Sequence, residues 1–195
     1  MTHPAHDAVV FDLGGVLLDW SPSHVLAPDD VTALDIDGAQ RELDLGTPVA
    51  QVRARWRTAH PGRTATVDHY FDDWQRTVAG PIDDVVTILT ELRDRPVGLY
   101  ALSNFSGELF RQARPRFAFL EWFDGMVISG DEGVIKPDTR IYELLVDRFE
   151  LTPSRTVFID DRENNVAAAR EAGLVAIHFR SADTLRSTLG ALGLL

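Results

Sequence analysis

The chain is 195 residues long, 45% hydrophobic and 25% charged, with a formal net charge of −11 and no cysteine. This length is enough for one domain with a substantial core, or for one domain with an insertion. The negative charge argues against nucleic acid or an anionic membrane surface as a partner, the lack of cysteine excludes disulfides and thiolate sites, and no apolar run approaches the roughly 20 residues of a membrane span. Because residues 1–7 lack the charged-then-apolar pattern of a secretion signal, we expect a cytoplasmic protein.

The first predicted element is a buried strand at residues 8–11. Its sequence is Ala-Val-Val-Phe, an apolar run with two β-branched residues, and a carboxylate, Asp12, follows directly. The pair Gly14-Gly15 comes next, and glycines allow a backbone to approach a ligand closely. An acidic side chain directly after a buried parallel strand lies where open α/β sheets place their ligands, so Asp12 is the first candidate site residue.

Residues 19–81 predict a small helical segment inserted after this strand. Between residues 31 and 79 the helical periodicity is broken and no convincing strand is present, with one helix expected to begin near Thr47-Pro48 and a second one from Val67 to Val78. We expect the aromatic and charged side chains of this segment to serve packing or a solvated surface. If the segment is a lid over a site, the candidates to face that site are His24, Arg53, Arg57, His60 and Trp74.

The remainder of the chain alternates between helices and short strands. Helices are predicted at residues 81–95, 106–113, 138–149, 162–172 and 185–192, strands at 97–102, 125–129, 156–159 and 174–178, and a loop at 130–133. This alternation indicates an α/β fold with a Rossmann-like parallel sheet and helices on both faces. The predicted core comprises residues 1–18 and 82–195, and the inserted helical domain comprises residues 19–81.

Five polar residues are predicted to meet at one edge of that sheet. Asp12, Ser103, Asp160 and Asp161 lie at the carboxyl ends of strands, which share an edge in a parallel sheet. Lys136 precedes a helix and is the only lysine among 19 basic residues, the other 18 being arginine. Because an ammonium is a compact point charge and a guanidinium a broad planar fork, we interpret Lys136 as a position that arginine cannot fill.

This set of side chains predicts a chemistry. Clustered carboxylates repel one another unless a cation joins them, and a divalent ion held by carboxylates, a carbonyl and waters is typical of Mg²⁺, which usually serves a phosphate. A lysine, a hydroxyl and helix N-termini supply further groups that bind anions. One carboxylate can then act as the nucleophile and form an aspartyl-phosphate intermediate.

The chain resembles the haloacid dehalogenase-like (HAD) hydrolase superfamily, in the branch with a helical cap inserted after the first strand. The resemblance covers nearly the whole chain and rests on four ordered motifs: Phe11-Asp12-Leu13-Gly14-Gly15-Val16, Leu102-Ser103-Asn104, Lys136-Pro137-Asp138, and Phe158-Ile159-Asp160-Asp161 with Asn165 behind it. It implies a Mg²⁺-dependent phosphatase of a small-molecule phosphate ester, in which Asp12 is the nucleophile and a metal ligand.

The same resemblance implies roles for the other motif residues. The carbonyl of Gly14 and the carboxylate of Asp161 would bind Mg²⁺, and Asp160 and Asn165 would complete or orient the metal's surroundings. Ser103 and the amide of Asn104 would hold the phosphoryl oxygens. Lys136 would bridge the phosphate and the nucleophile.

One position departs from the family pattern. Active phosphatases of the superfamily usually carry a second aspartate two residues after the nucleophile, where this chain has Gly14. Loss of a general acid and base typically costs about 10²–10⁴-fold in rate. Three explanations stay open: a substrate with a good leaving group, with a sugar phosphate favoured; another proton donor, such as Asp19 or a cap residue; or weak catalysis in a protein that mainly binds.

Two alternative functions are weighed against the phosphatase. A 2-haloacid dehalogenase uses the same aspartate to attack carbon without a metal, but it has little use for the Asp160-Asp161 pair and usually carries tyrosine at the position of Gly14. A non-catalytic member that binds a phosphorylated ligand or a protein is favoured by Gly14 and opposed by the presence of Asp12, Lys136 and the aspartate pair. A response-regulator-like fold does not accommodate the helical insertion.

Overall fold

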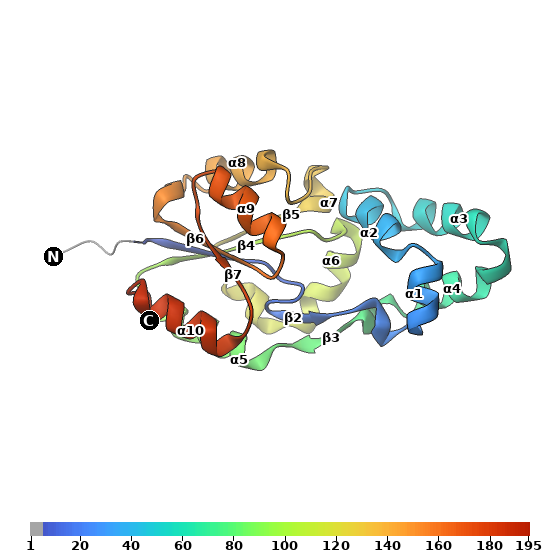
Figure 1. The fold of residues 1–195 in the computed structure, drawn as a ribbon, viewed down its shortest axis with the longest axis horizontal. Helices are drawn as coiled ribbons and strands as arrows, with labels where there is room; N and C mark the ends of the chain where they lie inside the picture. Colours follow the sequence, from blue (N-terminus) through green and yellow to red (C-terminus); the bar gives the residue numbers. More distant parts are fainter. Residues whose placement is uncertain (1–5) are drawn as a thin grey trace.

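A five-stranded parallel sheet forms the centre of the computed structural model, which describes residues 6–195 (Figure 1). The strand order is β5-β4-β1-β6-β7, formed by β1 (Ala8–Phe11), β4 (Gly98–Ser103), β5 (Gly125–Ile128), β6 (Thr156–Asp160) and β7 (Val175–His178). The predicted α/β class and the parallel sheet are confirmed. Of the stretch searched for a secretion signal, residues 1–5 lie outside the described part.

Helices cover both faces of the sheet, and the central strand shows why its sequence is apolar throughout. Val9 and Phe11 belong to the core on one face, which includes α5 (Asp83–Arg93) and α10 (Ala182–Ala191). Val10 belongs to the core on the other face, with α8 (Thr139–Arg148) and α9 (Glu163–Glu171). A strand buried on both faces has no polar side, so it reads as a continuous apolar run.

Two short elements of the core differ from the predictions. The loop expected at residues 130–133 is wrong, because the short helix α7 (Ser129–Glu132) begins directly after β5 and ends at Gly133, which has a φ of +69°. The terminal helix begins at Ala182 rather than at residue 185, since the Ser181 hydroxyl accepts a hydrogen bond from the Thr184 backbone and caps the helix earlier. The helix α6 (Gly107–Ala113) lies as expected.

A helical insertion, defined here as residues 21–77, extends from one end of the sheet (Figure 1). Its core gathers the rings of Trp56, Tyr70 and Phe71, whose centroids lie 5.4–5.8 Å apart. In chain order its elements are the 3₁₀ turn η1 (Pro22–His24), α1 (Pro28–Ala33), α2 (Ile36–Asp44), α3 (Val49–Ala59), η2 (Pro61–Arg63), α4 (Thr64–Asp72) and η3 (Trp74–Thr77). Within residues 6–195, no helix has the length and apolar character needed to cross a bilayer.

A two-stranded antiparallel ribbon joins the insertion to the sheet. It pairs β2 (Leu18–Trp20) with β3 (Val78–Pro81). The expectation that no strand occurs up to residue 79 is therefore wrong at its end, and Val78 belongs to a strand rather than to a helix. The pairing joins residues far apart in sequence, so the local pattern of either segment alone does not indicate it.

The turn between α2 and α3 rests on the carboxyl edge of the sheet. The hydroxyl of Ser129, directly after β5, donates a 2.7 Å hydrogen bond to the carbonyl of Asp44. Gly46 has a φ of +89°, and a Cβ on it would lie 2.5 Å from the carbonyl oxygen of Gly130, so only glycine permits this close approach. The insertion is thereby held over the strand ends that carry the predicted site residues.

Candidate active site

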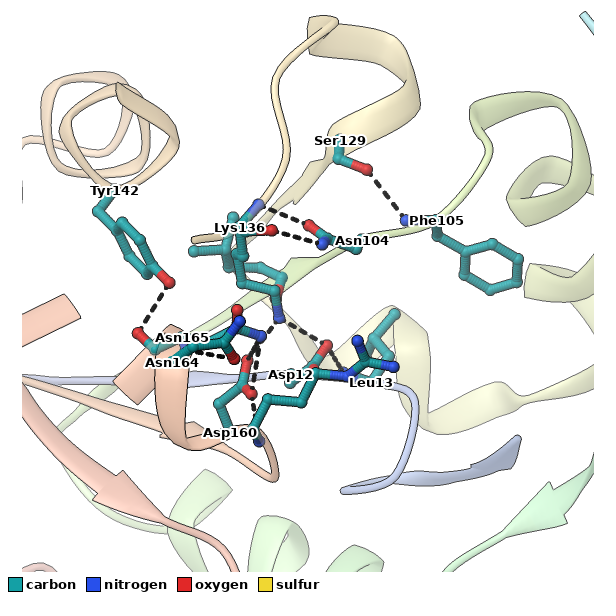
Figure 2. A network of polar contacts seen from close by, with 12 residues as sticks. Asp12, Leu13, Asn104, Phe105, Ser129, Lys136, Tyr142, Asp160, Asn164 and Asn165 are labelled. Carbon is teal, nitrogen blue, oxygen red and sulfur yellow. Dashed lines mark hydrogen bonds and ion pairs between the residues drawn. The ribbon is translucent and has the colours of Figure 1, made fainter. Parts of the chain in front are cut away.

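The ammonium of Lys136 is the centre of the polar network at the carboxyl edge of the sheet (Figure 2). Its Nζ lies 2.9 Å from Asp12 Oδ1 and 2.7 Å from Asp160 Oδ2, and it donates a 2.8 Å hydrogen bond to the carbonyl of Leu102. The residue is only 2% exposed. The three N–H donors meet three acceptors at the ends of three neighbouring strands, a geometry that suits a compact ammonium better than a broad planar guanidinium.

Asp160 is a fully buried carboxylate, and both of its oxygens accept hydrogen bonds. Its Oδ1 accepts from the backbone of Arg162 and from the Asn165 amide, and its Oδ2 accepts from Lys136 and from the same amide, at 2.7–3.1 Å. The carbonyl of Asn165 in turn accepts a 2.9 Å bond from the hydroxyl of Tyr142. Asp160 is therefore placed to orient Lys136 and the loop after β6.

Asn104 fixes the segment that carries Lys136. Its side-chain amide donates to the Lys136 carbonyl at 3.0 Å and accepts from the Lys136 backbone at 2.8 Å, so both ends of the amide are used. Ser103, the last residue of β4, is buried, and no side-chain hydrogen bond within the described residues engages its hydroxyl. These two residues and Lys136 line one side of a shared cavity.

Burial and mutual repulsion disfavour the charged forms of the carboxylates at this edge. Burial raises the pKa of Asp12 to about 7, and the neighbouring Asp160 and Asp161 add to this effect against the opposing influence of Lys136. Burial and Asp160 also raise the pKa of Asp161. For Lys136, the attraction of Asp12 and Asp160 outweighs the effect of burial, so its pKa is raised and the ammonium stays charged. Three acidic groups thus meet only two positive charges, that of Lys136 and, beside Asp161, that of Arg162.

The donor set fits a divalent metal ion. Asp12, Asp160 and Asp161 each offer a carboxylate oxygen, and these atoms lie within 4.8 Å of one another. Such oxygen ligands suit hard cations, and a divalent ion would balance the negative charge of the carboxylates that Lys136 does not neutralise. Gly15 has a φ of +78°, and a Cβ there would lie 2.6 Å from Asp161 Oδ2, so glycine keeps the backbone close to the acidic cluster.

A cavity of about 440 Å³ opens above this cluster, between the sheet edge and the helical insertion. Of the predicted site residues, those that line it are Asp12, Gly14, Ser103, Asn104, Lys136, Asp161 and Asn165. Its roof comes from residues that the sequence analysis did not select, namely Trp20, Asp37, Gln40, Arg41 and Asp44, and Arg162 joins them from the loop before α9.

None of the five candidate lid residues lines this cavity. His24 contacts Asp19 and the carbonyl of Thr77, and Arg53 and Arg57 both pair with Asp68. A different signal marks the roof. Three polar residues of α2 recur at helical spacing on a side away from the buried Ile36, Ala39 and Leu43, namely Asp37, Gln40 and Arg41, and the buried Asp44 follows them in the next turn.

Comparisons with known proteins agree with the geometry. The family model described as haloacid dehalogenase-like hydrolase matches residues 6–173. A sesquiterpene phosphatase of Aspergillus oryzae is 27% identical over 187 residues, which cover 88% of each chain. A phosphoglycolate phosphatase of Caulobacter vibrioides is 25% identical over 198 residues, which cover 94% of this chain and 84% of the relative.

Solved structures share the fold. A HAD family enzyme of Bacteroides thetaiotaomicron, in complex with magnesium and inorganic phosphate, superimposes with a TM-score of 0.75 at 20% identity over 90% of this chain and 94% of that one. An L-2-haloacid dehalogenase of Xanthobacter autotrophicus gives a TM-score of 0.64 at 18% identity over 95% and 83%. The family match spans most of the sequence, and the protein is therefore an enzyme of the haloacid dehalogenase-like hydrolase family.

Proposed function

We propose that this hydrolase is a Mg²⁺-dependent phosphatase that acts on a small phosphorylated metabolite through a phosphorylated Asp12. The observation that carries the proposal is the buried Lys136 ammonium, which bridges Asp12 and Asp160 at 2.9 and 2.7 Å at the base of the cavity. A fixed positive charge beside a carboxylate nucleophile is what phosphoryl transfer requires, because that reaction depends on positioning and on neutralising charge. The phosphatase names of two relatives with similar chain coverage support the same reaction class.

Each side chain then has a role. Asp12 would attack the phosphorus in line, since its Oδ1 is held by Lys136 and by the backbone of Leu13 at 2.7 Å. Lys136 and Ser103 would bind phosphoryl oxygens, and Asn104 would position Lys136 through its two hydrogen bonds. Lys136 also favours the charged form of Asp12, the form that can attack.

Asp12, Asp161 and the carbonyl of Gly14 would hold Mg²⁺. When bound, the ion would supply charge neutralisation at the phosphoryl oxygens. Asp160 would support this site indirectly, because hydrogen bonds from Lys136, Asn165 and the Arg162 backbone already occupy its oxygens.

The helical insertion, together with the ribbon of β2 and β3 that joins it to the sheet, would form a cap domain of residues 19–81 that closes the cavity and selects the substrate. The polar stripe of α2 faces the cavity with Asp37, Gln40 and Arg41, which provide donors and acceptors for hydroxyl groups. This lining favours a sugar phosphate as substrate. A panel of sugar phosphates beside a prenyl phosphate tests this preference, and faster turnover of the prenyl ester would contradict it.

The first experiment is release of phosphate from p-nitrophenyl phosphate and acetyl phosphate, with Mg²⁺ and with EDTA. We expect turnover that requires Mg²⁺ and that Asp12→Asn abolishes. The matched control is Asp147→Asn, the same change at an exposed position of α8, which should retain full activity. No turnover of either ester by the folded wild-type protein would favour a binding function, and halide release from 2-chloropropionate in EDTA would favour a dehalogenase.

A further inference from the structure

The proposed phosphatase reaction needs a proton donor that the first motif lacks. When a phosphate ester is cleaved, the departing oxygen must gain a proton unless its alcohol is unusually acidic. Gly14 stands two residues after Asp12, where it offers a carbonyl oxygen and no titratable side chain. A proton donor for ordinary esters must therefore come from another wall of the cavity.

Among the described residues that line the cavity, four are carboxylic acids: Asp12, Asp37, Asp44 and Asp161. Asp12 and Asp161 belong to the nucleophile and to the proposed metal site. Asp37 is exposed, whereas Asp44 is only 8% exposed at the end of α2. Asp44 is thus the one acid that is both shielded from solvent and outside the acidic cluster at the sheet edge.

The structure holds Asp44 firmly at both its backbone and its side chain. Its carbonyl accepts the hydrogen bond from Ser129, and Gly46 anchors the following turn against Gly130. Its Oδ1 accepts from the Gln40 amide at 2.9 Å, and the oxygen of that amide accepts from the Tyr70 hydroxyl at 3.4 Å. Its Oδ2 makes no hydrogen bond to any described residue, so one carboxyl oxygen stays available to a molecule in the cavity.

The surroundings of Asp44 favour a carboxyl that changes its charge near neutral pH. Burial raises its pKa to about 6, against the opposing effects of the Gln40 hydrogen bond, Arg162 and Lys136. Tyr70 on α4 also interacts with it, and the other titratable side chains of the same cavity are Asp37 and Arg41 on its own helix and Asp12 and Asp161 at the sheet edge. An acid and base that works near neutral pH is most effective when its two charge states are both accessible there.

We propose that Asp44 is the general acid and general base of the phosphatase reaction, replacing the side chain that Gly14 lacks. The inference rests on the proposed function and assigns its missing proton donor. In the first step an Asp12 oxygen bonds to phosphorus while the ester P–O bond breaks, and protonated Asp44 gives its proton to the departing oxygen to form the alcohol. In the second step the Asp44 carboxylate takes a proton from water as the water oxygen attacks phosphorus. The Asp12–phosphate bond breaks, hydrogenphosphate leaves, and both side chains return to their starting states.

The test compares leaving groups in Asp44→Asn, which keeps the size of the side chain and removes its proton. For phenyl phosphate, whose leaving group is basic, we expect kcat/KM to fall by about 10²–10³-fold, and for p-nitrophenyl phosphate by less than about 10-fold. The variant should also release a rapid burst of p-nitrophenolate followed by slow turnover, because the phosphorylated Asp12 lacks its base. The ratio of kcat/KM for phenyl phosphate between the wild type and Asp44→Asn should fall as the pH rises above about 6, because the ionisation of Asp12 and of the ester affects both proteins alike and only the wild type loses the acid.

The matched control is Asp147→Asn, the same change at an exposed position of α8 that does not line the cavity, which should leave the ratio of the two rates unchanged and show no burst. An equal fall on both esters in Asp44→Asn, or no fall at all, would overturn the assignment of Asp44 while the phosphatase itself stood. The absence of wild-type turnover on both esters would instead reject the proposed function.

Discussion

Replacing Asp44 by asparagine should make the protein gain stability relative to the wild type as the pH rises, because above about pH 6 the native fold shields a charged carboxylate from water. Below its ordinary pKa of 3.8 the carboxyl is neutral in both the folded and the unfolded chain, so its burial has no effect through charge. As the pH rises toward about 6, the unfolded chain loses this proton first, and the free energy of unfolding falls.

The magnitude follows from the two pKa values. Raising the pKa from 3.8 to about 6 lowers the wild-type free energy of unfolding by about 3 kcal/mol at pH 8 and by about 1.6 kcal/mol at pH 5. Asparagine keeps the acceptor for Gln40 and does not titrate. The stability difference between Asp44→Asn and the wild type should therefore grow by about 1.4 kcal/mol between pH 5 and pH 8.

The assay is urea unfolding followed by tryptophan fluorescence at several pH values in EDTA, so that no divalent ion contributes. The pH dependence of the difference is the decisive quantity, because the cost of placing an amide at this site is the same at every pH. Asp37→Asn, exposed on the same helix, should differ from the wild type by less than about 0.5 kcal/mol throughout. A stability difference between Asp44→Asn and the wild type that does not vary with pH would refute the claim that burial disfavours the charged form of Asp44.

Three further predictions concern the site and its roof. Lys136→Arg should destabilise the protein by about 1–3 kcal/mol and abolish phosphate release, because the guanidinium is wider than the ammonium that lies between Asp12 and Asp160. Urea unfolding and turnover of p-nitrophenyl phosphate test this prediction. A variant with wild-type stability and activity would show that the lone lysine has no special role. Mg²⁺ at 100 times its Kd should stabilise the wild-type protein by about 2.7 kcal/mol, whereas the same Mg²⁺ concentration should stabilise Asp161→Asn much less. The measurement is the shift in Tm on adding Mg²⁺. Equal shifts for the two proteins would show that Asp161 is not a metal ligand. Gly46→Ala should lower the free energy of unfolding more than Gly193→Ala does. Both glycines have a positive φ, but only at Gly46 would the new Cβ meet a backbone oxygen, that of Gly130. Equal losses of unfolding free energy in urea would contradict the close packing of the insertion on Gly130.

The sheet and its edge could be predicted from the sequence because their signals are local. A strand buried on both faces must be apolar along its whole length, so β1 and β6 appear directly as short apolar runs. Parallel strands place their carboxyl ends on one edge, so the sequence predicts that Asp12, Ser103, Asp160 and Asp161 lie close together. The single lysine was likewise visible as a departure from a composition dominated by arginine.

The roof of the cavity was decided by tertiary structure alone. The amphipathic pattern of α2 shows which face is buried, but it does not say what the opposite, polar face meets. Gln40, Arg41 and Asp44 reach the cavity because the turn after α2 packs on Ser129 and Gly130, residues some 85 positions away in the chain. Only the folded chain shows that this contact places Asp44 in the same cavity as Asp12.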